Sequence, residues 1–158
     1  MGLFRKSPTG FLKFFLRAPI ALYQLRLGWL LTSHLLMLTT KGRKSGKPRR
    51  AVVEVVQHDK SSGNYYVMSG WGRGSDWFLN IMKEPKARVD VGFRRFEAIA
   101  RVTPDDLGAG VLYDYACRYP AVFEKLTKTL TGEELSGTRE ECSQLVQLAP
   151  MVSLQPPS

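Results

Sequence analysis

The chain has 158 residues, 44% of them hydrophobic and 23% charged, which is an ordinary composition for one globular domain with a real core. Its net charge of +9 is uneven, because residues 1–50 carry eleven Lys or Arg residues and no acidic residue. That excess favours an anionic ligand, an anionic membrane surface or both. The longest apolar run, residues 27–38, is too short to span a bilayer. The two cysteines lack metal-ligand spacing, so a reduced cytoplasmic protein without a metal site is expected.

Residues 1–33 are predicted to form an N-terminal helical segment. Cations alternate with aromatic residues between Phe11 and Arg17, which is typical of a short amphipathic helix, and Pro19 ends or kinks it. A second, strongly apolar helix follows. Both helices could pack on the domain, or the first could act as a lid over a ligand pocket or rest on a membrane surface.

The remainder of the chain predicts an α+β domain built from β-hairpins. Turn residues separate apolar runs of strand length, and capping signals at Ser75, Thr103 and Thr138 each open a helix. Hairpin order predicts an antiparallel sheet or barrel, with its topology left open. The predicted strands are residues 34–40, 49–57, 65–69, 86–91, 94–102 and 151–154.

A cationic loop joins the first two predicted strands. Between Lys41 and Arg50 it holds six Lys or Arg residues, and its glycines, Gly42 and Gly46, allow a ligand to approach the backbone. Arg and Lys together suit phosphate or carboxylate groups. The glycine spacing is wrong for a phosphate-binding P-loop. The loop also lacks the aromatic residues that a nucleic-acid surface would interleave, so no nucleic-acid partner is expected.

The order of residues in this loop resembles a known signature. Thr39-Thr40-x-Gly42-Arg43-Lys44-Ser45-Gly46-x-Pro48-Arg49 is similar to that of the deazaflavin-dependent nitroreductase/quinone reductase family. The segment from Ser69 to Asn80 and the pair Tyr119-Pro120 match two further family segments in the same order. The resemblance runs from about Pro19 to Leu154, and it implies a single split β-barrel domain over residues 1–158.

The resemblance also implies residue roles around coenzyme F-420, a deazaflavin with a phosphate and an acidic tail. The residues implied to bind this cofactor are Arg43, Lys44, Ser45, Arg49, Ser69, Gly70, Trp77 and Asn80. Those implied to act in catalysis are Tyr119, on the substrate side, and Ser69, against the deazaflavin ring. For Trp77, a purely structural place in the core is the competing interpretation.

The implied activity is hydride transfer from reduced F-420 to a quinone-like, nitro or other unsaturated acceptor. Val122 and Lys125 stand where better-known nitroreductase members carry tyrosines, which leaves the acceptor open. Two alternatives remain: an FMN-dependent enzyme on the same barrel, and a non-catalytic protein that binds a cofactor or lipid. The expected location is the cytoplasm, with contact between residues 1–18 and the inner face of the membrane as a further hypothesis, in which case the acceptor could be a membrane quinone.

Overall fold

The computed structural model describes residues 35–69 and 72–157. The predicted N-terminal helical segment and Gly70 lie outside these residues. The described elements, in chain order, are β1 (Leu35–Lys41), β2 (Pro48–His58), β3 (Tyr65–Met68), α2 (Asp76–Lys83), β4 (Lys86–Val91), β5 (Arg94–Val102), α3 (Asp105–Arg118), α4 (Pro120–Thr131), α5 (Arg139–Leu148) and β6 (Met151–Gln155).

The six strands form a closed barrel in the order β1-β2-β3-β6-β5-β4. Every neighbouring pair is antiparallel, including the β1–β4 pair that closes the barrel. The prediction of an α+β fold with about six antiparallel strands is therefore confirmed. The sequence left the strand topology open. The structure shows that β6 lies between β3 and β5 in the barrel.

Side-chain alternation along the strands divides the apolar residues between two cores. On β2, Val53 and Val55 pack inside the barrel, as successive residues of a strand face opposite sides. Val56, on the opposite face of the strand, belongs to the second core together with Leu112 of α3 and Val146 of α5. The second core thus fixes the helical layer to the outer wall of the barrel at β2.

All three predicted helices are present, and Ser75 and Thr138 stand at the N-cap positions of α2 and α5 as predicted, whereas the cap predicted at Thr103 is wrong. Thr138 forms the predicted capping box with Glu141 at the start of α5. Ser75 precedes α2, but its hydroxyl donates to the Gly72 carbonyl inside the preceding turn. Thr103 does not cap α3, which has Pro104 at that position. Instead, the Thr103 N–H donates to the Met151 carbonyl of β6, and the Thr103 side chain is buried.

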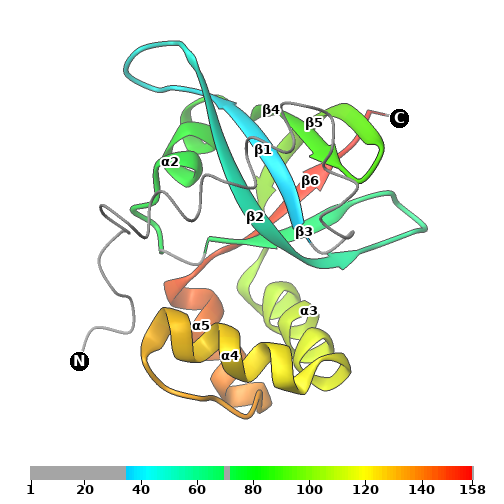
Figure 1. Ribbon diagram of the computed structural model, residues 1–158, viewed down its shortest axis with the longest axis vertical. Coiled ribbons are helices and arrows are strands. Elements are labelled where there is room, and N and C mark those ends of the chain that lie inside the picture. The colour runs from blue at the N-terminus through cyan, green and yellow to red at the C-terminus, as the bar shows by residue number, and fades with distance from the viewer. Residues whose placement is uncertain (1–34, 70–71, 158) are drawn as a thin grey trace.

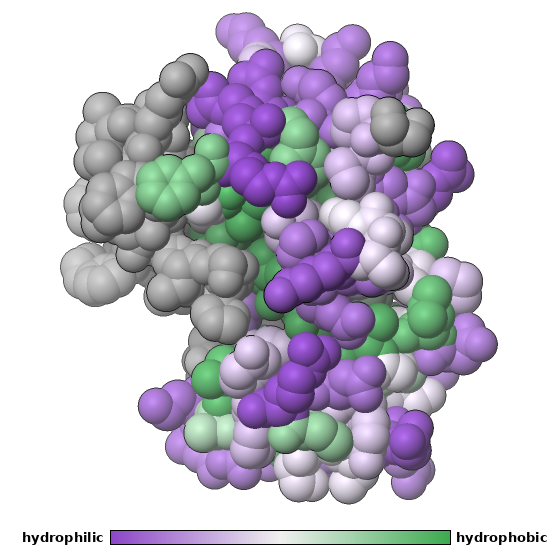
Figure 2. Space-filling model, turned by 90° about the vertical axis from the view of Figure 1, so that its right-hand side faces the viewer, coloured by the Kyte–Doolittle hydropathy of each residue, from purple (hydrophilic) through white to green (hydrophobic). Residues whose placement is uncertain are grey.

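The helices lie at two places on the barrel (Figure 1). α3, α4 and α5 form a layer at one end of the molecule, while α2 lies beside β1 and β2 near the β1–β2 loop. On the face in Figure 2, hydrophilic side chains cover much of the barrel and apolar ones surround a hollow near its middle. Within the described residues no helix has the length and apolar character needed to cross a membrane.

Candidate functional site

The β1–β2 loop is a compact turn whose shape depends on its glycines. The Gly46 N–H bonds the Gly42 carbonyl at 2.8 Å, and the Gly42 N–H bonds the Lys47 carbonyl at 2.8 Å. Gly46 has a φ of 71°, in the left-handed region that favours glycine. A Cβ on Gly42 would lie 2.9 Å from Ser45 Oγ and 3.0 Å from the Lys47 carbonyl oxygen. The loop therefore presents a fixed backbone surface.

Asn80 of α2 anchors this loop to the barrel. Its Oδ1 accepts from the Arg43 backbone N–H at 3.1 Å and from Arg43 Nη1 at 3.0 Å. Its Nδ2 donates to Thr40 Oγ1 at 3.1 Å, and both Asn80 and Thr40 are 2% exposed. Lys83 Nζ adds a bond to the Arg43 carbonyl at 2.9 Å. A buried amide with all these partners fixes where the cationic loop lies.

The Arg43 guanidinium is used within the protein. Besides its bond to Asn80, its Nη2 lies 3.2 Å from Asp76 Oδ1 in an ion pair. The side chain of Arg43 is 25% exposed, whereas that of Asp76 is 87% exposed. The Arg43 guanidinium therefore helps to position the loop against α2, and its predicted contact with the cofactor stays a prediction.

A cavity of about 260 Å³, called the anion cavity below, lies between this loop and α2. Lys44 and Arg49 are exposed beside it, and Arg49 Nη2 donates to Ser45 Oγ at 3.4 Å. A second cavity of about 350 Å³ shares the loop residues and extends to Lys83. Ammonium and guanidinium donors with accessible backbone suit a chain of phosphate and carboxylate groups. The first cavity is lined by Gly42, Arg43, Lys44, Ser45, Arg49, Asp76 and Asn80.

Ser69 closes the turn that leads from β3 to α2. It is fully buried, and its Oγ lies within hydrogen-bonding distance of the Gly72 carbonyl oxygen and 2.6 Å from Ser75 Oγ, where either hydroxyl can be the donor. Its backbone N–H bonds the Pro150 carbonyl at 3.1 Å. The hydroxyl predicted to act in catalysis thus bonds residues that lead into α2, and its catalytic role stays a prediction.

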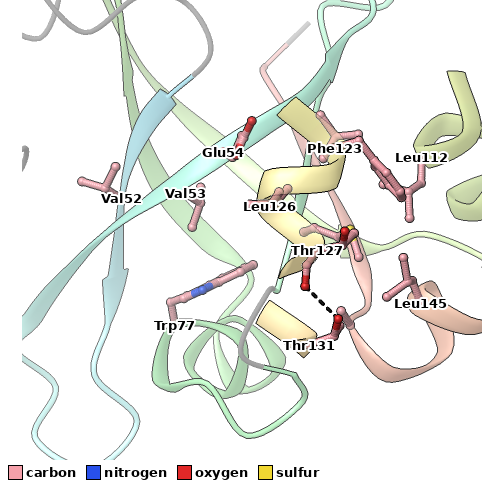
Figure 3. A pocket seen from close by; sticks show the side chains of 13 residues that line it. Val52, Val53, Glu54, Trp77, Leu112, Phe123, Leu126, Thr127, Thr131 and Leu145 are labelled. Carbon is pink, nitrogen blue, oxygen red and sulfur yellow. Dashed lines mark hydrogen bonds between the residues drawn. The ribbon is translucent and has the colours of Figure 1, made fainter. Parts of the chain in front are cut away.

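An apolar pocket of about 140 Å³ lies between β2, α2 and the helical layer (Figure 3). Trp77, itself 9% exposed, reaches toward it from α2, and Leu126 and Thr127 contribute from α4. Trp77 is therefore a core residue that also lines a pocket, and its predicted contact with the cofactor stays a prediction. The full lining is Val52, Val53, Glu54, Val56, Met68, Trp77, Leu112, Phe123, Leu126, Thr127, Thr131, Leu145 and Ala149.

Glu54 and Tyr115 form a polar pair at this pocket that the sequence analysis missed. The Tyr115 hydroxyl donates to Glu54 Oε1, joining α3 to β2 across 61 residues. Burial raises the pKa of Tyr115 well above its usual range, and the carboxylate raises it further, so the hydroxyl stays a donor. The one local signal was an acidic residue inside the apolar run Ala51–Val56.

Tyr119 lies at the junction of α3 and α4. Its ring is 5.6 Å from that of Tyr115, and the residue is 40% exposed. It is outside the lining of both the anion cavity and the apolar pocket. The structure thus brings Arg43, Lys44, Ser45, Arg49 and Asn80 together, while Tyr119 belongs to the helical layer at the other end of the molecule (Figure 1).

The anion cavity and the apolar pocket share two elements. On α2, Asp76 and Asn80 face the cationic loop, while Trp77 faces the pocket. On β2, Arg49 lines the cavity and Val53 lines the pocket, four residues or about 13 Å farther along the strand. One elongated ligand with an anionic end and a ring-like end could therefore contact both.

Comparison with known proteins decides the family. Residues 23–131 match the model of the F-420H(2)-dependent quinone reductase family. The chain belongs to this family. The family's cofactor makes the protein an F-420-dependent oxidoreductase.

Solved structures share the fold of this family member. An F-420-H2-dependent reductase, FDR-A, is 20% identical with a TM-score of 0.52, covering 77% of this chain and 94% of its own. A chain described as a domain-swapped dimer is 18% identical, with a TM-score of 0.53 and coverage of 87% and 99%. General stress protein 26 from Bacillus anthracis is 14% identical, with a TM-score of 0.53 and coverage of 85% and 89%. A search of curated proteins gave no match.

Proposed function

We propose that this protein passes a hydride from reduced F-420 to a quinone-like, nitro or other unsaturated acceptor. The observation that carries the proposal is the placement of an anion cavity and an apolar pocket along the same strand and helix. The cofactor, when bound, supplies the hydride, and the protein supplies binding, orientation and exclusion of water.

The chain's own residues divide these tasks. Lys44 and Arg49 bind the phosphate and the carboxylates of the tail, with the backbone around Gly42 close to them. Arg43 and Asn80 hold that loop in position. At the other end, the apolar side chains around Trp77 keep water away from the reacting rings.

The remaining hypotheses about partners concern the acceptor and the membrane. We infer that Tyr119 contributes a hydroxyl on the acceptor side, since its ring packs near Tyr115 and is partly exposed. We also propose a cytoplasmic protein whose residues 1–18 contact the inner face of the membrane, where a membrane quinone would be the acceptor. The cation-and-aromatic pattern of that segment supports this proposal.

The direct test is oxidation of reduced F-420 by the purified protein. Loss of the reduced cofactor is followed by absorbance with a benzoquinone, a naphthoquinone, a nitroaromatic compound and an enone as separate acceptors. We expect turnover with at least one of the four and stoichiometric reduction of that acceptor. Oxidation of the cofactor that is no faster than in the absence of protein, with every acceptor, would contradict the proposal.

A further inference from the structure

A further cavity, here called the outer cavity, lies where the β1–β2 loop meets strands β4 and β5. It has a volume of about 160 Å³, and its residues come from β1, β2, β4, β5 and the loop, with none from α2. Three of them are basic and one is acidic, so the cavity favours an anion. The lining is Thr39, Thr40, Lys41, Gly46, Pro48, Lys86, Ala87, Arg88 and Glu97.

Strand register brings the three basic side chains together. β1 and β4 pair antiparallel with Thr40 opposite Ala87. Continuing that register by one residue places Lys41 opposite Lys86. Arg88 follows Lys86 by two residues and therefore lies on the same face of β4. Like charges that lie opposite each other on a sheet are destabilising, so an anion bound between these side chains would relieve their repulsion.

The basic groups of the outer cavity keep donors for a ligand. Within residues 35–69 and 72–157, the ammonium groups of Lys41 and Lys86 form no ion pair. Arg88 pairs with Glu97 through its Nε, at 3.4 Å, and both side chains are at least half exposed. The two ammonium groups and the outer edge of the Arg88 guanidinium therefore suit a carboxylate or a phosphate.

The outer cavity adjoins the cavities on the α2 side of the loop. The cavity of about 350 Å³ shares Lys44 with the anion cavity, and it shares Lys41 and Gly46 with the outer cavity. A Cβ on Gly46 would lie 3.9 Å from Lys41 Cε, so the Lys41 side chain runs beside the loop backbone at this point. An anionic chain could therefore pass from the anion cavity to the outer cavity along a path lined by cations.

From this arrangement we propose that the outer cavity is a second anion subsite, in which Lys41, Lys86 and Arg88 bind a carboxylate or phosphate group. This group is either the far end of the F-420 tail or a separate small anion, since both present the same oxygens to the same donors. In the first case the inference rests on the proposed function and deepens it. That function gives Lys44 and Arg49 to the tail, and a tail with more than two anionic groups needs further cations.

Fluorescence titration of the full chain with F-420 tests the first source. The variants are Lys86→Gln and Arg88→Gln, and Arg101→Gln is the matched control, because it removes an exposed cation of β5 outside the cavity lining. If the tail reaches the outer cavity, each variant should raise the dissociation constant of F-420 roughly three- to tenfold, since an exposed charge-assisted bond is lost. The KM for reduced F-420 should rise with it while kcat stays unchanged. The control should keep the wild-type affinity.

Glu97→Gln changes the same cavity in the opposite direction. It removes the one acidic group of the lining and leaves the Arg88 Nε without its carboxylate partner. Binding of F-420 should therefore become about two- to fivefold tighter, whereas Glu133→Gln, at an exposed acid outside the lining, should have no effect. A damaged fold would not produce tighter binding.

Inorganic phosphate tests the second source. It is titrated into the isotope-labelled chain without cofactor, and the backbone amide signals of Thr39 and Arg88 are followed by NMR. Saturable shifts that Lys86→Gln weakens, alongside wild-type F-420 affinity in that variant, would assign the subsite to a separate small anion. Wild-type F-420 affinity in all the cavity variants, together with no saturable shift, would overturn the inference. Quinone turnover that persists with that result refutes only this inference, whereas absent turnover with weakened F-420 binding in Lys86→Gln refutes only the proposed function.

Discussion

The position of Asn80 beside the cationic loop predicts that a negative charge introduced at this residue lowers cofactor affinity even when the fold is kept. In Asn80→Asp, a carboxylate oxygen still accepts both bonds from Arg43, and the Thr40 hydroxyl can rotate to become a donor. The guanidinium of Arg43 compensates the new charge. The loop should therefore keep its place while the cavity beside Lys44 and Arg49 becomes less positive.

The magnitude follows from the distance over which the new charge acts. A unit charge about 8 Å from a ligand phosphate contributes about 2 kcal/mol at an effective dielectric constant of about 20, and about 0.8 kcal/mol once salt screens it over one Debye length. The dissociation constant of F-420 should therefore rise about fourfold at physiological salt and about thirtyfold at low salt. By contrast, Asn80→Leu leaves the buried Thr40 hydroxyl and the Arg43 N–H without their partner, which costs about 2–4 kcal/mol of folding stability.

Fluorescence titration with F-420 at two salt concentrations, together with urea unfolding, separates the two effects. Asn64→Asp is the matched control, because it makes the same charge change in the β2–β3 turn, at the far end of β2 from the loop (Figure 1). We expect weaker, salt-dependent binding in Asn80→Asp and unchanged binding in the control. Wild-type affinity in a folded Asn80→Asp protein would refute the reasoning that places the anionic tail in this cavity.

Three further outcomes are expected. Tyr119→Phe should lower turnover of a quinone roughly tenfold while F-420 affinity stays unchanged, since one positioned hydrogen bond is lost; steady-state kinetics that match the wild type would remove Tyr119 from the acceptor site. The Asp59 carboxyl should titrate with a pKa of about 2, held low first by Ser61 and then by Ser62, so its contribution to stability is present above about pH 4 and is lost as pH falls toward 2. Carbon-detected NMR should show that pKa rising in Ser61→Ala, and an unchanged value would contradict the assignment. Removal of residues 1–18 should weaken sedimentation with anionic vesicles and spare turnover of soluble quinones, whereas equal sedimentation would end the membrane hypothesis.

Local sequence signals were sufficient for most of the fold. Alternating apolar residues and turn residues predicted both ends of each strand from β1 to β6 to within one residue. The capping box at Thr138 was readable because its two partners are three residues apart. Thr103 carried the same kind of signal, but a long-range bond to Met151 takes its backbone into the sheet. Tertiary contacts overrode a local preference at that residue.

The sequence predicted the cationic loop of the candidate site, but it did not predict the hydrogen bonds that join the loop and its strand to the helices. The cationic motif predicted an anion site, and its residues do lie around one cavity. The motif could not show that Arg43 pairs with Asp76, 33 residues away, or that Tyr115 bonds Glu54, 61 residues away. Such partners depend on how β2 packs against α2 and α3, and spacing along the chain contains no signal for them.

The most direct test of the account is the affinity of the protein for F-420 compared with FMN, in the wild type, Lys44→Ala and Arg49→Ala. F-420 has a multiply anionic tail, whereas FMN has one terminal phosphate, so the wild type should bind F-420 more tightly. Each substitution should weaken F-420 binding roughly ten- to a hundredfold, because each removes a charge-assisted hydrogen bond, and rising salt should weaken it further. Equal affinity for FMN and F-420, or unchanged F-420 affinity in both variants, would contradict the assignment of the β1–β2 loop as the cofactor-binding site.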